Sequence, residues 1–560
     1  MAKGSPPLMC SRRTREAPPE PSQALSSSTA RTRMSGVLPR LGRLVMSKLR
    51  LCGWRQSLRS TTQTRRLPAG TTRDSQSCRG PEETGRLSML GRLCAVPAPE
   101  PRAWERRVEA AEPGSATPGR SPKAAALPRV LTVWSMVGLI FFEVSGSTYG
   151  IEPVVRKAGD PWSAALGLAV VPLVWSVPIA LMTAEMCSAY PHVGGKIYFV
   201  QDAFGPYVGW LNGAFNAVSN VFDVATLPAM ALGYAERLGG EAFEGLGVYF
   251  AVAMVAGACT LNILGVELVG VTSYVFTILV CSPFLVLMAM GAPRLPLLRT
   301  EEFATIPMSR LKFLSCLLWN MSGYDDAGAT AAEVINPQEV YPRSLSIAVS
   351  IVTGSYLLPV LVGLTVQPDV SAWRDGEFVR IGELIGGPVL SVVIALLGVL
   401  SCFGQLNALL CSSVREIVCL AELPRQPVPR FLAKLHPRFM TPHVTTVLFS
   451  CLLLLLVNAD FTDLIAASMF FDCFSFFLQF AAWVKHRARA RPGYAALPGE
   501  GGYRAPFGFA GVLAMTAFPV VLCLLAVLLT MLEHGHKGMV GLCGTFLVSS
   551  LVYLVQPRGA

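Results

Sequence analysis

The feature that most restricts this chain is the near-continuous series of long apolar segments that runs from about residue 130 to its end. About 20 apolar residues is the length that an α-helix needs to cross the hydrocarbon core of a bilayer. Twelve such segments are predicted, near residues 131–156, 162–190, 200–233, 245–264, 266–291, 311–333, 344–366, 384–420, 443–458, 460–484, 508–531 and 538–555. The composition agrees, because 52% of the residues are hydrophobic and only 15% are charged. The sequence therefore predicts an all-α, polytopic membrane protein with twelve transmembrane helices.

The N-terminal 127 residues differ from the rest in charge. They hold 23 Lys and Arg against 9 Asp and Glu, whereas the remaining residues hold 24 against 27. A stretch rich in Ser, Thr, Pro and Arg cannot bury enough apolar surface to fold. We therefore expect residues 1–127 to be a disordered basic tail and residues 128–560 to form a transmembrane transporter domain. A tail that lies on anionic lipid, a transit peptide, and an extension upstream of a later start codon such as Met34 are the alternatives for this segment.

The residues that bind metals or carry redox chemistry show no arrangement typical of a cofactor site. The fifteen cysteines include no pair with C-x-x-C spacing, and all six histidines lie at predicted helix ends or in loops. Cysteines that act as small buried hydrophobic side chains explain this distribution. We expect no cofactor, no metal site and no enzymatic activity. Nucleic-acid binding is not expected either, because Trp54 and Trp104 are the only aromatic residues of the basic tail.

The Lys and Arg residues of the short connections predict the orientation in the membrane. They concentrate after the eighth and the tenth segments, for example at Arg430, Lys434, Lys485 and Arg487, whereas the connection 234–244 holds three acids and one Arg. Because cytosolic loops carry the excess of Lys and Arg, both termini are expected in the cytosol. The plasma membrane is the expected location, with an organellar membrane as the alternative.

The first and the sixth apolar segments are each interrupted by small and polar residues. These include Ser145, Gly146 and Ser147 in the first segment and Gly323, Tyr324 and Asp325 in the sixth. Unwound backbone is tolerated at membrane depth only where protein, water or a ligand satisfies its peptide groups. The two segments take corresponding positions in two sets of five, as in transporters whose broken helices build a site between inverted repeats. We therefore predict two inverted five-helix repeats with broken helices 1 and 6, and a substrate site at the breaks.

Carboxylates inside the apolar segments are a second signal of function, because they are costly in a bilayer and mark ion or proton pathways. They are Glu143, Glu185, Asp223, the Asp325/Asp326 pair and Asp472. No Lys or Arg lies near the centres of these segments, so we expect a negative interior that attracts a cation. Glu143 and Asp223 are the main candidates, whereas Glu185 could lie at the cytosolic mouth and Asp472 could bond a neighbouring helix. Asp326 is expected to point away if Asp325 points inward, because adjacent helical positions do not share a face.

Several motifs resemble those of the amino acid/polyamine/organocation superfamily, and within it the plant and protist polyamine uptake transporters related to L-type amino acid transporters. The matching residues are FFEVSG at 141–146, YGIE at 149–152, PLVWSVPIALMTAE at 172–185, FGPYVGW at 204–210 and YDDAGATAAEVINPQEVYPRSL at 324–345. The resemblance covers roughly residues 130–555. The sequence departs from that branch at Ser147 and Thr148, where it more often has Gly-Pro, and at Gly323, where it tends to have an aromatic residue.

The resemblance implies alternating access around helices 1 and 6 and a substrate pocket at their breaks. The substrate-binding residues that it implies are Ser145, Gly146, Ser147, Gly323, Tyr324 and Asp325, and Glu143 and Asp223 match acidic positions of the polyamine branch. The fifth segment has no Lys that could replace a coupling cation, so a carboxylate must carry a coupled proton, with Glu143 and Asp223 as the candidates. No obligate protein partner is expected, because no Cys stands in a predicted outer loop where a disulfide could join one.

The leading hypothesis is secondary active import of a polyamine such as putrescine or spermidine by proton symport. Surplus carboxylates favour extra amines, whereas backbone donors favour a substrate carboxylate, so an amino acid transporter or exchanger of the same fold is the alternative. An intramembrane aspartyl protease could use the Tyr324-Asp325 pair, although the usual G-x-G-D partner motif is missing. An ion channel and a non-transporting sensor of the same fold are further alternatives.

Overall fold

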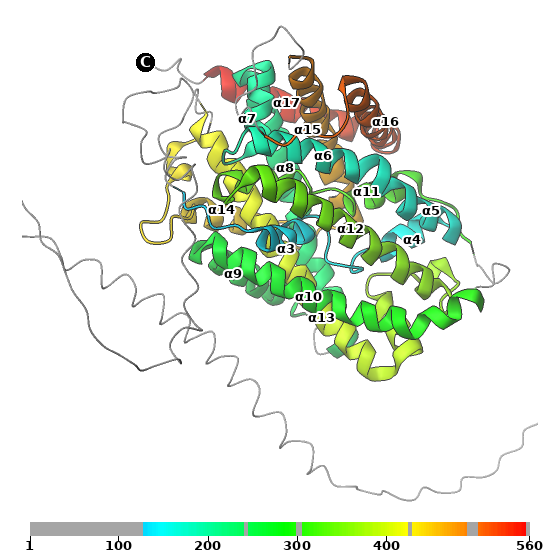
Figure 1. Cartoon of the computed structure of the whole chain (residues 1–560). Helices are drawn as coiled ribbons and strands as arrows, with labels where there is room; N and C mark the ends of the chain where they lie inside the picture. Colours follow the sequence, from blue (N-terminus) through cyan, green and yellow to red (C-terminus); the bar gives the residue numbers. More distant parts are fainter. Residues whose placement is uncertain (1–126, 240–244, 298–304, 424–427, 490–501, 556–560) are drawn as a thin grey trace, which may run out of the picture. The chain divides into compact units, whose positions relative to one another are not determined.

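The computed structural model describes residues 127–239, 245–297, 305–423, 428–489 and 502–555 (Figure 1). Residues 1–126 lie outside the described part, so the predicted tail stays a prediction. Across the described ranges the secondary structure is helical, and the only β-type pairings are isolated bridges near Leu131 and Gly146. The predicted all-α class is confirmed for this part of the chain.

The helices follow the predicted apolar segments closely, and two of those segments are split. The first half contains α3 (Val133–Val144), α4 (Glu152–Ala158), α5 (Pro161–Val171), the π-helix η2 (Pro172–Ser176), α6 (Val177–Ala189), α7 (Gly195–Phe204), α8 (Pro206–Gly239), α9 (Gly247–Leu264), α10 (Val266–Gly291) and the 3-10 helix η4 (Ala292–Leu297). The second half contains α11 (Arg310–Trp319), the 3-10 helix η6 (Asp326–Glu333), α12 (Pro337–Leu364), η7 (Val370–Ala372), α13 (Glu377–Glu422), η8 (Arg430–Ala433), α14 (His443–Leu453), α15 (Phe461–Arg489), α16 (Phe509–His534) and α17 (His536–Val555).

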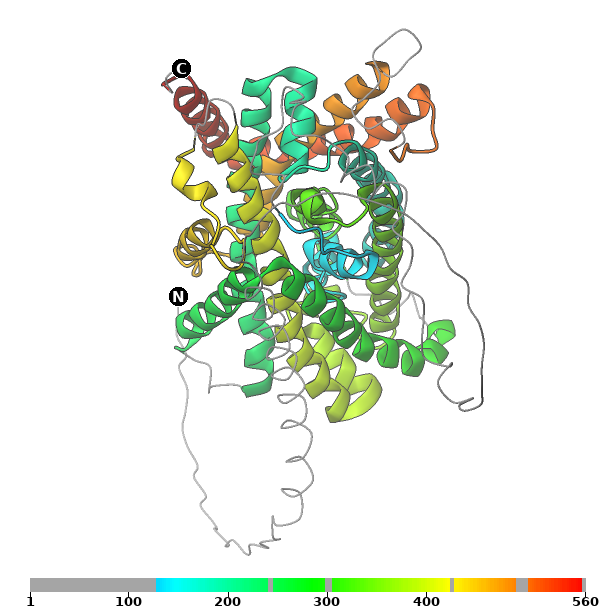
Figure 2. The ribbon, with the colours of Figure 1, turned by 60° about the vertical axis from the view of Figure 1, so that its left-hand side comes forward.

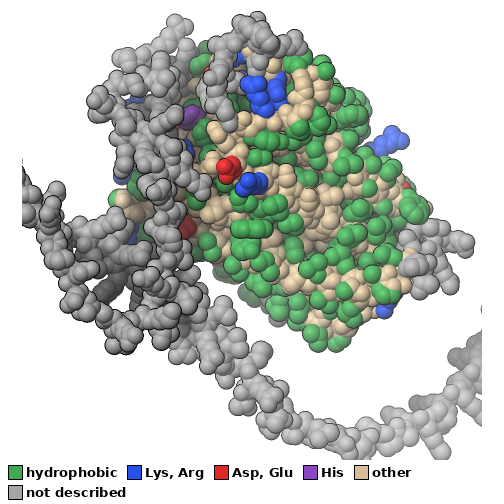
Figure 3. Space-filling view, in the orientation of Figure 1, with side chains coloured by type: hydrophobic (Ala, Val, Ile, Leu, Met, Phe, Trp, Pro, Cys, Tyr) green, Lys and Arg blue, Asp and Glu red, His purple; other side chains and the backbone are tan. Residues whose placement is uncertain are grey.

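Seven helices in the described ranges are long and apolar enough to cross a membrane. They are Pro161–Ala189, Gly247–Leu264, Val266–Leu295, Pro337–Leu364, Glu377–Glu422, Phe461–Arg489 and Phe509–Glu533, and shorter apolar helices lie at Val133–Val144, His443–Leu453 and Val540–Val555. Many of their large apolar side chains point outward, for example Leu524 and Leu528 of α16. Figure 3 shows a face on which apolar side chains dominate and charged ones are few. An outward-facing apolar surface of this extent fits lipid rather than water, so the protein is a multi-pass membrane protein.

The broken first segment lies at the centre of the helix assembly. Residues Met136–Val144 of α3 are all buried, and α3 contacts α10, α12 and α13 (Figure 2). An α-helix that is buried on all sides is apolar around its whole circumference, which matches the sequence MVGLIFF that precedes Glu143. The polar residues of the first break are therefore held in a dry environment.

The two broken segments are joined at one end by their backbones. The Val130 and Leu131 amides donate to the Glu333 carbonyl at 2.9 and 3.0 Å, and the Ile335 amide donates to the Leu131 carbonyl at 3.1 Å. The beginning of the first segment thus lies beside the end of η6, where Leu131 and Val334 form a parallel bridge. These three hydrogen bonds fix the relative position of the two breaks.

Candidate functional site

The first break extends from Ser145 to Ile151, between α3 and α4. Two hydrogen bonds join it to neighbouring helices. The Ser401 hydroxyl of α13 donates to the Gly146 carbonyl of the break at 2.6 Å, and the Thr148 hydroxyl of the break donates to the Ser355 carbonyl of α12 at 2.6 Å. Ser147 has a left-handed backbone with φ of 70°, which is strained for a residue other than glycine. The break is therefore a defined conformation held by α12 and α13, as expected for unwound backbone buried in protein.

The second break extends from Asn320 to Asp325, between α11 and η6. The π-helix η2, which the sequence analysis did not anticipate, supplies two of its partners: Trp175 Nε1 donates to Ser322 Oγ at 3.0 Å, and Ser176 Oγ donates to the Met321 carbonyl at 2.9 Å. Tyr324 is fully buried. The predicted unwinding is present in both segments.

The two breaks touch at Gly323. Its φ of 101° is in the left-handed region, and a Cβ atom at this position would lie 2.3 Å from the Glu143 carbonyl oxygen. Only glycine fits such an approach of one backbone to another. The predicted site residues at 143–147 and 323–325 therefore lie in one place, although about 180 residues separate them in the sequence.

At this contact, Glu143 is the residue whose side-chain hydrogen-bonding capacity is least satisfied. Its side chain is 4% exposed, and neither carboxylate oxygen has a hydrogen-bond partner within the described residues. The charged groups that interact with it electrostatically are Asp326, Lys196, Glu416 and Asp325. The Gln405 Nε2 amide beside Gly146 is also buried without a partner. Buried polar groups are nearly always paired, so these two side chains have hydrogen-bonding capacity that a ligand, a proton or water could fill.

Asp223 of α8 is linked to the start of the second break by a hydrogen bond from the Trp319 indole. Trp319 Nε1 donates to Asp223 Oδ1 at 2.5 Å, and Trp319 is the last residue of α11. The Trp319 ring also borders Gly150 of the first break, at 3.8 Å from the position of a Cβ atom there. Asp223 is thus linked to the start of the second break through Trp319, and its carboxylate already has one donor.

Asp325 and Asp326 are bound by a buried lysine that the sequence analysis overlooked. Lys196 Nζ of α7 lies 2.9 Å from Asp325 Oδ2 and 3.0 Å from Glu416 Oε1, and it also contacts Asp326 Oδ1. Gln479 Nε2 donates to Asp325 Oδ2 at 3.0 Å. The expectation of a negative interior without a basic residue is therefore wrong, because Lys196 lies just before the predicted segment 200–233, in the first turn of α7.

The expected opposite orientation of Asp325 and Asp326 is also wrong. Both side chains bond to the same Lys196 ammonium. The rule that adjacent residues face different directions holds inside an α-helix, but Asp325 belongs to the unwound break and Asp326 is the first residue of a 3-10 helix. The change of helix type lets two neighbours converge.

The two remaining acidic candidates differ in their surroundings. Glu185 forms an ion pair with Arg487 of α15 at 2.7 Å and accepts from Trp483 Nε1 at 3.1 Å, so a structural role explains it without a ligand. Asp472 of α15 interacts electrostatically with Asp325 and Lys196.

A second cluster closes the other end of the first break. Tyr234 OH donates to Glu152 Oε1 at 2.9 Å, and the Gly150 amide donates to Glu152 Oε2 at 3.0 Å. The Tyr149 and Tyr234 rings meet edge to face at 5.1 Å. Glu152 and Lys196 lie toward opposite ends of the Pro161–Ala189 helix, since α4 precedes its start and α7 follows its end. The site is therefore covered from both directions.

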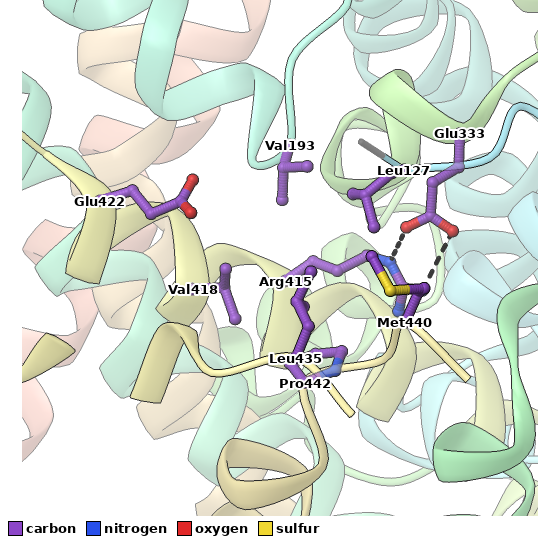
Figure 4. Close-up of a pocket in the computed structure, with 9 residues that line it drawn as sticks. All are labelled: Leu127, Val193, Glu333, Arg415, Val418, Glu422, Leu435, Met440 and Pro442. Atoms are coloured by element: carbon purple, nitrogen blue, oxygen red, sulfur yellow. Dashed lines mark hydrogen bonds and ion pairs between the residues drawn. The ribbon is translucent and has the colours of Figure 1, made fainter. Parts of the chain in front are cut away.

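A small cavity near the end of α13 does not suit an organic substrate. Its volume of about 20 Å³ holds roughly one water molecule. Figure 4 shows Glu333 and Arg415 pointing toward each other in its wall, and their ion pair has an Nε–Oε1 distance of 2.7 Å. The volume of this cavity is too small for an organic amine.

Within the described ranges no three His, Cys, Asp or Glu side chains are arranged to hold a metal ion. The eleven described cysteines are free thiols. The ligand chemistry that this site offers is therefore that of carboxylates, hydroxyls, amides and unwound backbone.

Comparison with known sequences agrees with the geometry. A family model described as amino acid permease matches residues 131–546. Polyamine transporter PUT1 of Oryza sativa subsp. japonica is 35% identical over 424 residues, which cover 74% of this chain and 76% of the relative. Polyamine transporter RMV1 of Arabidopsis thaliana is 33% identical over 404 residues, covering 70% and 79%. The serine/threonine exchanger SteT of Bacillus subtilis is a more distant relative, 25% identical over 56% of this chain and 72% of its own length.

Proposed function

Because this chain belongs to the amino acid permease family of the amino acid/polyamine/organocation superfamily, we propose that it imports polyamines of the putrescine and spermidine class by proton symport. Its family and its relatives are transporters rather than enzymes. The single observation that carries the choice of a polyamine is Glu143, a buried carboxylate without a partner at the contact between the two helix breaks. An ammonium group is the natural partner of such a carboxylate.

In the proposed pocket, the unwound backbone and the acidic side chains have different roles. Ser145, Gly146, Ser147, Gly323 and Tyr324 shape it, and the unwound peptide groups and hydroxyls among them offer hydrogen bonds to the substrate. Glu143 binds one ammonium group directly. Asp223 attracts a second amine from the direction of Glu152, and Asp325 acts from within its ion pair with Lys196.

Proton coupling is assigned to Glu143 or Asp223. A carboxylate buried without a cation can accept either a proton or an ammonium group, and exchange between the two would couple their movements. Glu143 has no counter-ion in contact, and Asp223 is held only by the neutral Trp319 indole. Both can therefore change partners without first breaking an ion pair.

The full transport cycle requires a finer architecture, which we propose as well. The start of the first broken segment lies beside the end of the second, and Gly323 contacts Glu143 partway along both. This arrangement supports two inverted five-helix repeats within twelve crossings. We place both termini in the cytosol, because of the basic connections, and the protein in the plasma membrane. The α7 end of the site then faces the cytosol, and the Glu152 end faces outward.

Amino acid transport or exchange by the same site is the second candidate. It is favoured by the family description and by the serine/threonine exchanger among the relatives. Unwound backbone near Gly146 and Gly323 could bind a substrate carboxylate. In that case Glu143 would bind the α-amino group.

The test is uptake of labelled spermidine into cells that lack their own transporter, at two external pH values. We expect saturable uptake that rises at the lower pH and is lost in Glu143→Gln and in Asp223→Asn. Asp463→Asn is the matched control, because this acid is 62% exposed and lies outside the site. Entry of leucine or serine without spermidine would contradict polyamine transport and favour the second candidate.

A further inference from the structure

The most heavily charged group of side chains in the described part of the chain surrounds the Lys196 ammonium. Lys196 is 1% exposed, and its ammonium contacts the carboxylates of Asp325, Asp326 and Glu416. These four residues belong to α7, the second break, η6 and α13. A buried ammonium is stable only when it is paired. One carboxylate would balance its charge, yet three are present.

The charges of this cluster do not balance. Three carboxylates face one ammonium, and no second cation contacts them among the described residues. Their other contacts are neutral amides: Gln479 donates to Asp325, and Asn216 and Asn220 donate to Glu416. Amides stabilise the carboxylates but carry no charge. The cluster therefore has the capacity for another positive group.

Unpartnered polar atoms around the cluster point to a donor-rich ligand. Gln479 and Asn216 are 0% and 1% exposed, and their side-chain oxygens, Oε1 and Oδ1, have no hydrogen-bond partner. The Glu143 carboxylate, also unpartnered, interacts electrostatically with all four members of the cluster. An ammonium group supplies three N–H donors and a positive charge. An ammonium group would therefore supply both the positive charge and the hydrogen-bond donors that this cluster lacks.

The structure of the Lys196 side chain indicates which class of ligand could bind here. Four methylene groups and a terminal ammonium form an aminobutyl group, which is also one end of putrescine and of spermidine. A site that holds the Lys196 side chain thus already accommodates the end of such a substrate. Because Gly323 touches Glu143 and is two residues from Asp325, the cluster lies next to the proposed pocket.

We propose that Asp325, Asp326 and Glu416 form a second ammonium site on the α7 side of the breaks, which Lys196 occupies at rest and the aminobutyl end of the substrate enters during release. The proposal rests on the proposed function and extends it. The substrate amine displaces Lys196, and the return of Lys196 then expels the substrate. Without the Lys196 ammonium as a competitor, the excess carboxylates on the α7 side of the breaks would retain a polyamine.

The experiment measures the dissociation constant of spermidine and its uptake for the wild type and Lys196→Gln. We expect the variant to bind spermidine about tenfold more tightly, because a competing charge is gone, and to turn over about tenfold more slowly. Adding Asp326→Asn should return both values toward the wild type. Lys312→Gln is the matched control, since Lys312 forms an ion pair with exposed Asp463 at 3.0 Å.

A purely structural role for Lys196 predicts a different result. Binding and transport would then weaken together in Lys196→Gln, and unchanged or weaker spermidine binding in a folded variant would overturn the proposal. If Lys196→Gln does not fold, Lys196→Gln/Glu416→Gln is compared with Glu416→Gln, and the same tightening is expected.

The wild type separates this proposal from the proposed function. A wild type that neither binds nor carries spermidine would refute polyamine import. The ammonium site would then be judged on Lys196→Gln alone, where gained spermidine binding would support it and no binding would refute it as well.

Discussion

The two helix breaks are similar in sequence character but differ in how their polar groups are satisfied. The first break is held by neutral hydroxyl–carbonyl hydrogen bonds to α12 and α13, and the Glu143 carboxylate beside it has no partner within the described residues. The second break ties its carboxylates to Lys196 and Gln479. The difference shows that paired breaks need not be equivalent. The first leaves a carboxylate without a partner, whereas the acids of the second are already paired within the protein.

The contact between the breaks should be the least tolerant point of the site. In Gly323→Ala the new Cβ atom meets the Glu143 backbone, which cannot move aside, and the left-handed φ adds strain. We expect the variant to lose roughly 3 kcal/mol of stability or more, measured by thermal unfolding of the purified protein. Gly354→Ala is the control, because nothing lies within 4 Å of its Cβ position. Equal stability of the two variants would show that the breaks do not touch.

Neutralising one acid in each break tests the comparison directly. Asp325→Asn weakens a buried cluster and should cost about 3 kcal/mol of stability. Glu143→Gln removes a buried charge that has no partner, so its stability should stay the same or rise, while spermidine uptake falls roughly 100-fold. Thermal unfolding and uptake are measured on the same preparations. A loss of stability in Glu143→Gln equal to that in Asp325→Asn would contradict the asymmetry.

The link between Asp223 and Trp319 should have an intermediate effect. Trp319→Phe removes the indole donor and leaves the Asp223 carboxylate without this hydrogen bond. We expect uptake to fall about tenfold, with a smaller change in stability than for Asp325→Asn. Phe461, whose ring meets Trp319 at 5.9 Å, provides the control variant Phe461→Leu, which keeps the hydrogen bond. A larger loss of uptake in the control would assign the effect to ring packing.

The smallest expected effect concerns backbone strain in the first break. Ser147 adopts a φ of 70°, and Ser147→Gly should raise stability by about 1 kcal/mol by relieving it. Ser145→Gly is the comparison, since its φ of −152° is extended and offers no strain to relieve. A fall in stability in Ser147→Gly would mean that the serine hydroxyl contributes more than the strain costs.

The breaks and their acids were predictable because small and polar residues are conspicuous inside apolar segments. Glu143, Gly146 and Gly323 stood out for that reason, and the structure brings them together. Lys196 gave no such signal, since it lies in a short helix between two predicted spans and enters the core only through the fold. The convergence of Asp325 and Asp326 depended on a change of helix type that hydropathy does not report.

The backbone hydrogen bonds between Leu131 and the Glu333–Ile335 stretch have a mechanical consequence. They join the two broken segments at one end, and Gly323 contacts Glu143 further along. Two segments that are joined at one end and in contact at a second point can tilt together. Sliding of one segment along the other would break these contacts. If the proposed transport cycle opens the site toward each side in turn, we expect the rest of the bundle to move around this pair.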